Sequence, residues 1–227
     1  MNGIDEQLLR IEAIANTAEY AAAYKQREAE QLADIHRSQR ELVKRIGLPE
    51  KDRIHFHAQT PRETTALAHS RDVDGLLVLS GQAGCGKTVA ASWWLWRFVM
   101  EVGNWRWTDF GPKFLFRAPL FATATRLTRW PRFDAGRMTQ LHEASRLVVD
   151  DLGAEYMDEK GAFMAFLDEL VNERYANRRP TIFTTNLLAE DFRNRYGGEK
   201  GRIADRIRER GRFVSLATPS MRGADVP

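Results

Sequence analysis

Residues 77–92 read LVLSGQAGCGKTVAAS and pass from an apolar run directly into residues that cannot pack a core. From Gly81 to Thr88 the stretch matches the pattern G-x-x-x-x-G-K-[ST], with Gly84 as an additional glycine. Glycines permit positive φ and a close approach of the backbone, so that successive N–H groups converge on an anion at the start of a helix. The stretch therefore predicts a strand, a phosphate-binding loop and a helix, in that order.

The residue types of this loop suit a nucleoside triphosphate. The Lys87 ammonium is expected to reach the β- and γ-phosphates, and the Thr88 hydroxyl is expected to ligate Mg²⁺. Cys85 stands at a variable position of the pattern, where a small neutral filler is favoured over a redox role. The alternative for the whole stretch is a glycine-rich turn that holds no ligand. We predict that ATP contacts Gly81, Gln82, Ala83, Gly84, Cys85, Gly86, Lys87, Thr88 and Val89.

The composition is that of an ordinary globular protein. Of the 227 residues, 43% are hydrophobic and 29% are charged. The single cysteine excludes a disulfide within the chain and a cysteine cluster for zinc, and it fits a reducing cytoplasm. The N-terminal stretch MNGIDEQLLRIE is unlike a signal peptide, and no run approaches the roughly 18 apolar residues of a membrane span. We expect a cytoplasmic protein without a membrane partner.

Basic residues exceed acidic residues, and the formal net charge is +3. The excess is concentrated between Arg193 and Arg212, where eight Lys and Arg residues stand against three acidic residues, a local net charge of +5. Such a run is either a solvated face or a surface for a polyanion, and the sequence leaves both interpretations open.

Hydrophobic periodicity divides the chain into a helical part and an alternating part. Residues 5–45 lack Gly and Pro and carry apolar residues at helical spacing, so they predict one or two amphipathic helices that end near Gly47. Further along, short apolar runs alternate with helical stretches, which is typical of a largely parallel sheet covered on both faces. The predicted strands are 75–81, 113–121, 146–153, 180–186 and 212–217, and the predicted helices are 87–103, 137–145, 160–178 and 202–210.

Two acidic residues end the third predicted strand. Asp150 and Asp151 follow the apolar run LVV, and a charge at the end of a buried strand needs a partner. We assign Asp150 to the magnesium shell opposite Thr88, and we assign Asp151 to polarise the attacking water. The alternative is a pair of aspartates that cap the following turn.

The fourth predicted strand ends in a polar amide. Asn186 follows TIFTT, and an amide at this point can hold the attacking water near the γ-phosphate. The alternative is an N-cap for a helix that begins at LLAEDF. The order of the elements favours the first role. The catalytic residues predicted from the chemistry of the strand ends are Lys87, Asp150, Asp151 and Asn186.

These stretches together resemble AAA+ ATPases, and most of all the bacterial and phage replicative helicase loaders of the DnaC/DnaI type, with the IstB-type transposition helper ATPases close by. The resemblance implies an α/β P-loop NTPase fold with five parallel strands between helices, the first-sensor strand between the Walker strands, and no separate lid domain. It implies a helical partner-binding segment over 1–46, a connector over 47–74, an ATPase domain over 75–222 and a tail over 223–227. The stretches that carry it are GQAGCGKT (81–88), LVVDDLG (147–153), TIFTTN (181–186), RIADRIRERGRFVSL (202–216) and PSMR (219–222).

The same resemblance implies roles for two arginines. Arg206 in DRIR matches the arginine finger, Arg222 in PSMR matches the second-sensor arginine, and Asn186 becomes the first sensor. A finger given to a neighbouring site makes hydrolysis depend on self-association, because the guanidinium stabilises charge in the transition state. Asp151 stands where many AAA+ proteins carry Glu, so we expect slow hydrolysis. The alternative for each arginine is an ordinary surface residue.

A further segment suggests contact with nucleic acid. The stretch RLTRWPRFDAGR (126–137) interleaves arginines with aromatic residues, and single strands are held by base stacking and phosphate pairing. In loaders an insert near this position engages single-stranded DNA, whereas the plain alternative is a basic surface loop. The predicted contacts are Arg126, Arg129, Trp130 and Arg132.

The function implied by the resemblance is an assembly-dependent ATPase that loads or remodels a DnaB-type replicative helicase on single-stranded DNA. We expect the N-terminal helices to bind the helicase, because an amphipathic helix without its own core needs a groove elsewhere. An IstB-type helper that binds DNA and a transposase remains the alternative. A small-molecule P-loop kinase ranks third, since no stretch indicates a pocket for an acceptor.

Overall fold

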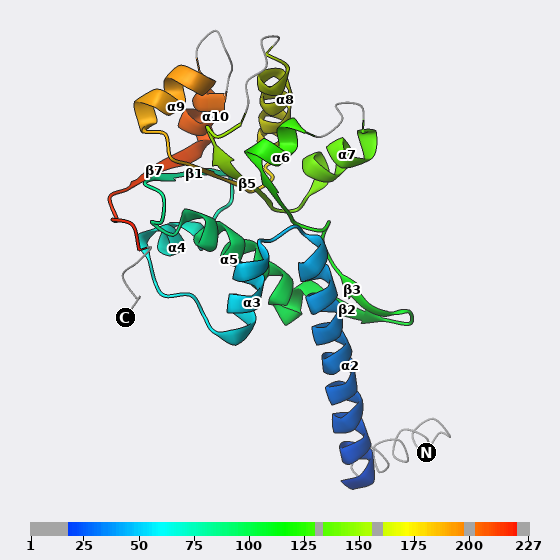
Figure 1. Ribbon diagram of the computed structural model, residues 1–227. Coiled ribbons are helices and arrows are strands. Elements are labelled where there is room, and N and C mark those ends of the chain that lie inside the picture. The colour runs from blue at the N-terminus through cyan, green and yellow to red at the C-terminus, as the bar shows by residue number, and fades with distance from the viewer. Residues whose placement is uncertain (1–17, 130–133, 156–160, 198–202, 222–227) are drawn as a thin grey trace, which may run out of the picture.

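A computed structural model describes residues 18–129, 134–155, 161–197 and 203–221 of the chain (Figure 1). Its centre is a sheet of five strands in the order β4-β5-β6-β1-β7, and every pairing in it is parallel. The fourth predicted strand therefore lies between the first and the third, as the resemblance implied. The strands are β1 (Leu76–Gly81), β4 (Leu120–Thr123), β5 (Leu147–Leu152), β6 (Thr181–Thr185) and β7 (Gly211–Leu216).

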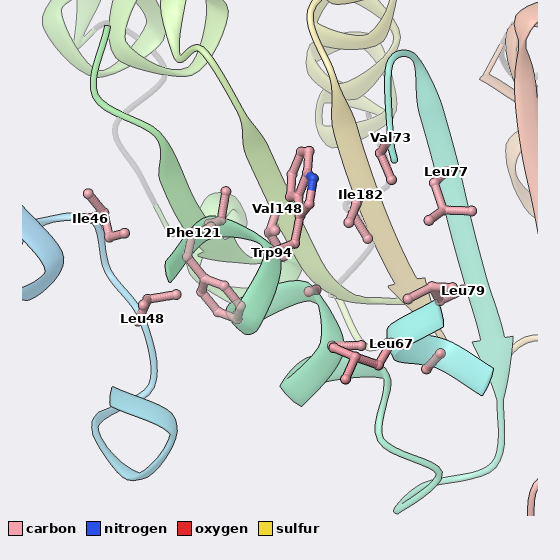
Figure 2. Close-up of a cluster of buried hydrophobic side chains, with 14 of the residues drawn as sticks. Ile46, Leu48, Leu67, Val73, Leu77, Leu79, Trp94, Phe121, Val148 and Ile182 are labelled. Carbon is pink, nitrogen blue, oxygen red and sulfur yellow. The ribbon is translucent and has the colours of Figure 1, made fainter. Parts of the chain in front are cut away.

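Each face of the sheet has its own core, because successive strand residues point to opposite faces. Leu77, Leu79 and Ile182 pack on one face, together with side chains of α2, α4 and α5 (Figure 2). Val78 and Phe183 pack on the other face with side chains of α6 to α10. The first group of helices is α2 (Ala18–Arg45), α4 (Thr65–Ser70) and α5 (Lys87–Met100), with α3 (Glu50–Ala58) against α5. The second group is α6 (Ala124–Thr128), α7 (Ala135–Glu143), α8 (Ala162–Ala176), α9 (Ala189–Tyr196) and α10 (Ile203–Arg210).

The predicted N-terminal helix is present in its described part. Only the C-terminal turns of α2 join the core, where Leu42 and Val43 are buried. Gln39 donates from Nε2 to the carbonyl oxygen of Met100 at 2.9 Å and so ties α2 to the end of α5. Residues 19–30 are exposed, and Figure 1 shows this half of α2 extending away from the sheet. None of the described helices is both long and apolar enough to span a membrane.

The prediction of one strand over 113–121 is wrong. The run splits into β3 (Gly111–Phe114), which forms an antiparallel hairpin with β2 (Trp105–Thr108), and β4, which begins only at Leu120. Pro119 stands directly before β4 and has no N–H for a ladder, which separates the two strands. A short 3-10 turn, η1 (Val102–Asn104), connects α5 to this hairpin. The hairpin is a two-stranded sheet of its own.

Candidate nucleotide-binding site

The loop between β1 and α5 follows the predicted order of strand, loop and helix. Gly84 and Gly86 have φ values of 91° and 90°, in the left-handed region that glycine occupies without strain. A Cβ atom on Gly86 would lie 3.0 Å from Cε of Met221, so a side chain there would crowd the C-terminal stretch. Gly86 is also the N-cap of α5, which begins at Lys87. The loop therefore brings bare backbone to the N-terminus of a helix, where anions are favoured.

The Lys87 side chain is buried and converges on the loop and on the end of β6. Its Nζ atom donates to the carbonyl oxygens of Gly81 and Gln82 at 2.7 and 2.9 Å. The same atom donates to Oδ1 of Asn186 at 3.0 Å. The Lys87 Nζ atom thus lies between the loop after β1 and Asn186 at the end of β6.

Asp150 lies at the end of β5 and is 8% exposed. Its Oδ1 atom accepts hydrogen bonds from the hydroxyls of Thr88 at 2.9 Å and of Thr184 at 2.6 Å. Burial raises the pKa of Asp150, although the two hydroxyls that donate to it act in the opposite direction. A buried carboxylate held by two hydroxyl groups is a favourable partner for a cation.

Asp151, the next residue, is exposed. Its φ of 64° is left-handed, at the point where the pairing between β5 and β6 is irregular, between Val149 and Leu152. The Asp151 N–H donates to the hydroxyl of Thr184 at 2.9 Å, and Asn186 donates from Nδ2 to Oδ1 of Asp151 at 3.4 Å. The irregular pairing places two adjacent carboxylates in different surroundings, one buried and one open to solvent.

The arrangement suits a hydrated magnesium ion bound to a polyphosphate. Mg²⁺ is usually held by one or two protein oxygens, with waters and phosphates completing its shell. Thr88 and Asp150 supply two such oxygens beside the cationic loop. Among the described residues, no group of three or more His, Cys, Asp or Glu side chains forms a metal cage. The donor set therefore fits a metal that arrives with the nucleotide.

Solved structures share this arrangement of sheet and helices. The crystal structure of DnaI has a TM-score of 0.51 at 17% identity, over 81% of this chain and 93% of that one. A crystal structure of the DnaC helicase loader has a TM-score of 0.49 at 18% identity, over 70% and 94%. A putative primosome component from Streptococcus pyogenes has 0.44 at 16%, over 78% and 86%. The sequence matches no protein-family model and no curated protein.

The chain has the fold of an AAA+ P-loop NTPase. In this AAA+ fold the strand order places β6 between β1 and β5, so that Asn186, Lys87 and Asp150 come together at the carboxyl ends of three neighbouring strands. Ligands of open parallel sheets bind at that edge.

The arginine assigned as a finger contacts α8 and α10 in the described part of the chain, and none of these contacts is with the Lys87 loop. Arg206 is on α10, donates from Nε to Oδ1 of Asn172 at 3.1 Å, and pairs with Glu209 at 3.1 Å. Its guanidinium lies 4.8 Å from the ring centre of Tyr175. These contacts all belong to α8 and α10, and about a third of the Arg206 side chain is exposed.

Of the predicted nucleic-acid residues, two are described. Arg126 and Arg129 are exposed on α6 and at its C-cap. Trp130 and Arg132 lie outside the described residues, and so does Arg222.

Sequence reasoning missed four contributors to the candidate site. Thr184 holds Asp150, and no local signal singled it out, because Thr181 and Thr185 of the same strand are also polar. Met221 and Thr64 flank Gly86, and their closeness depends on chain folding that no local pattern reveals. Glu155, which is buried, accepts from the Gly153 N–H at 2.6 Å and so fixes the turn that follows β5.

Proposed function

We propose that the chain binds ATP with Mg²⁺ at the Lys87 loop and hydrolyses it slowly, in an assembly of several copies in the cytoplasm. The observation that carries the proposal is the convergence of Lys87 and Asn186 beside the Thr88–Asp150 pair. A cation, a hydroxyl, a buried carboxylate and an amide are the groups that phosphoryl transfer from a magnesium-bound triphosphate requires. The AAA+ fold supports nucleotide hydrolysis in general.

Each side chain has a distinct role in this proposal. Lys87 transfers its hydrogen bonds from loop carbonyls to the β- and γ-phosphate oxygens, and Thr88 and Asp150 hold the metal from opposite elements. Asp151 accepts a proton from the attacking water, and Asn186 orients that water from the end of β6. The bound metal supplies charge neutralisation on the phosphates. Asp151 is exposed, so it reaches a water without the cost of moving a buried charge.

Hydrolysis depends on a neighbouring copy through Arg206. The guanidinium lies on α10 with a third of its side chain exposed, and its partners within the chain are an amide and a surface carboxylate that are easily exchanged. An arginine inserted into a neighbour's site accelerates phosphoryl transfer by about 10³ or more. Arg222 completes the site as the second-sensor arginine in the same proposal.

The assembly acts on a replicative helicase of the DnaB type and holds single-stranded DNA through Arg126, Arg129, Trp130 and Arg132. The likeness to structures named DnaI and DnaC helicase loader supports this choice over a transposition helper. The partner-binding segment is 1–46, and its support is that residues 19–30, in the N-terminal half of α2, are exposed. Tyr20 and Tyr24 are large side chains exposed on that half, and Leu32 is exposed just beyond it.

A capture experiment tests the function. The full chain, loaded with a non-hydrolysable ATP analogue and Mg²⁺, is mixed with purified DnaB-type helicase and with transposase in separate reactions. We expect the helicase to be retained, and we expect the double variant Tyr20→Ala/Tyr24→Ala to lose it while still binding nucleotide. Retention of the transposase alone would replace the loader with the transposition helper.

A further inference from the structure

The nucleotide chemistry makes no use of the β2–β3 hairpin (residues 105–114). Figure 1 shows it projecting from the body of the molecule beside α2. Its base is firmly held: Trp105 donates from Nε1 to the carbonyl oxygen of Val99 at 2.8 Å, and the Leu115 N–H donates to the Asn104 oxygen at 3.0 Å. The rings of Trp105 and Phe114 pack with their centres 5.1 Å apart. The hairpin is therefore a supported arm rather than a loose loop.

The arm carries large apolar side chains into solvent. Phe110 at its tip is fully exposed, at 101% of the reference area. Trp107 on β2 is 37% exposed, and Phe116, just beyond β3, is 48% exposed. Aromatic surface concentrated on one projecting element indicates a binding surface, whereas scattered apolar residues would need no explanation.

The face of the arm that turns away from its packed aromatic residues is cationic. Arg106 on β2 is directly opposite Lys113 on β3, and both are exposed. Like charges opposite each other destabilise a hairpin, and neither of these two residues forms an ion pair with another described residue. With Arg117 and the single acid Asp109, residues 104–117 carry a net charge of +2.

We propose that the β2–β3 hairpin binds single-stranded nucleic acid, with Arg106 and Lys113 on phosphates and Phe110 stacked on a base. Exposed aromatic rings among cations are how single strands are held without reading sequence, and a duplex offers no free base face to a ring at a hairpin tip. Lysine is depleted at protein interfaces, whereas phosphates attract lysine and arginine alike, so two adjacent cations without an acidic partner among the described residues favour the polyanion over a protein partner. The inference rests on the proposed function, which includes a single strand, and names a second surface for it.

This surface is separate from the predicted contacts on α6. The hairpin follows α5 and precedes β4, and its neighbour Phe116 packs 5.0 Å from Phe98 near the end of α5. The Arg146 guanidinium, just before β5, lies 4.0 Å from the same Phe98 ring, which places the arm at the amino ends of the strands. Helix α6 follows β4 at the carboxyl ends. The length of α5, about 20 Å, separates the arm from the phosphate loop.

Binding of a labelled oligothymidine of about 20 nucleotides tests the inference. The full chain is titrated with the probe in the presence of a non-hydrolysable ATP analogue, at several salt concentrations. We expect Phe110→Ala to weaken binding about tenfold, and it leaves the fold intact because the ring touches nothing. We expect Arg106→Glu/Lys113→Glu to reduce the slope of log affinity against log salt by about 1.4. The double variant Lys51→Glu/Arg62→Glu is the control, with the same change of charge on exposed connector residues and no change of slope.

Cross-linking to bromodeoxyuridine DNA gives the location directly, and we expect an adduct within residues 104–117. Wild-type affinity in Phe110→Ala together with no adduct in that segment would overturn the inference and leave single-strand binding elsewhere on the chain intact. Absence of any binding by the wild type would overturn the inference and the single-strand part of the proposed function together. Unchanged DNA affinity with lost helicase capture in the hairpin variants would assign the arm to the protein partner and would also overturn it.

Discussion

The Thr88 hydroxyl donates a hydrogen bond of 2.9 Å to Oδ1 of Asp150, across 62 residues of sequence. This bond joins the first turn of α5 to the end of β5. Its two oxygens are hard ligands of the kind that magnesium prefers. The geometry of the parallel sheet thus brings a hydroxyl and a carboxylate together at one edge.

The ionised form of the buried Asp150 carboxylate lowers the free energy of unfolding. Burial raises its pKa, so a folded chain with this carboxylate ionised is less stable than one with it neutral. A carboxyl group with a raised pKa in the folded state adds fully to the free energy of unfolding at a pH below its pKa in the unfolded chain. This stabilisation is lost as the pH rises through the pKa of the folded chain. We therefore expect Asp150→Asn to raise the melting temperature at pH 7 by a few degrees, and to have little effect near pH 4.

The same variant should lose magnesium-dependent nucleotide binding, because an amide is a weaker ligand than a carboxylate. Thermal denaturation at the two pH values and a nucleotide titration measure both effects. Asp151→Asn, at the exposed neighbour, is the matched control and should leave the melting temperature unchanged. A lower melting temperature of Asp150→Asn at pH 7 would contradict this account of the buried charge.

Asp151 is expected to serve the chemical step and not nucleotide affinity. Its carboxylate is exposed and contacts only the Asn186 amide within the site, and asparagine tolerates its left-handed φ of 64°. We expect Asp151→Asn to bind ATP as the wild type does and to hydrolyse it about 10² to 10⁴ times more slowly. Phosphate release under single-turnover conditions is the measurement, and an unchanged rate would remove Asp151 from the mechanism.

Arg206 is expected to act on a neighbouring copy. Arg206→Ala should keep its nucleotide affinity and lose about 10³-fold in assembly-stimulated hydrolysis. Arg208→Ala is the control, because Arg208 is on the same helix with 85% of its side chain exposed. Mixing Arg206→Ala with Lys87→Ala should restore activity. In such an assembly the Lys87→Ala copy supplies its Arg206 to the unaltered Lys87 site of the Arg206→Ala copy. Mixed assemblies as inactive as the separate variants would exclude action across the interface.

Arg174 supports the fold beneath the site. Its side chain is 1% exposed, and it donates to carbonyl oxygens of Leu141, Ala144 and Pro180 and to the hydroxyl of Thr181. These bonds join α8 to the chain segments before β5 and β6. We expect Arg174→Ala to lower the free energy of unfolding by about 3 kcal/mol in urea, because it leaves buried acceptors unpaired. Arg178→Ala, on an exposed residue of the same segment, should change it by less than about 0.5 kcal/mol; equal losses would refute the role.

The sequence predicted the five-stranded sheet well because its strands are short apolar runs between strong helix signals. The failure over 113–121 has a physical cause. Phe114 and Phe121 belong to different sheets, and an apolar run does not reveal that Leu115 and Phe116 between them remain exposed. The hairpin turns at Asp109 and Phe110, just before Gly111 with its φ of 96°, and Phe110 is a residue that local patterns place in a core.

The site was predictable where its residues end a strand or begin a helix. Lys87, Asp150 and Asn186 each do so, and the carboxyl ends of parallel strands meet at one edge. The bond from Thr184 to Asp150 depends on the register of β5 against β6, which is irregular at this point. The surroundings of Arg206 depend on how α10 packs against α8, and periodicity carries no information about that packing.

Calorimetric titration of the full chain with magnesium-loaded ATP tests the central claim most directly. The account predicts saturable heat with one site per chain, about 100-fold weaker in Lys87→Ala, because a charged hydrogen-bond donor to the phosphates is lost. Removal of the metal with a chelator should also weaken binding in the wild type. A well-folded wild-type chain that gives no saturable heat, or a Lys87→Ala variant that binds equally tightly, would contradict it.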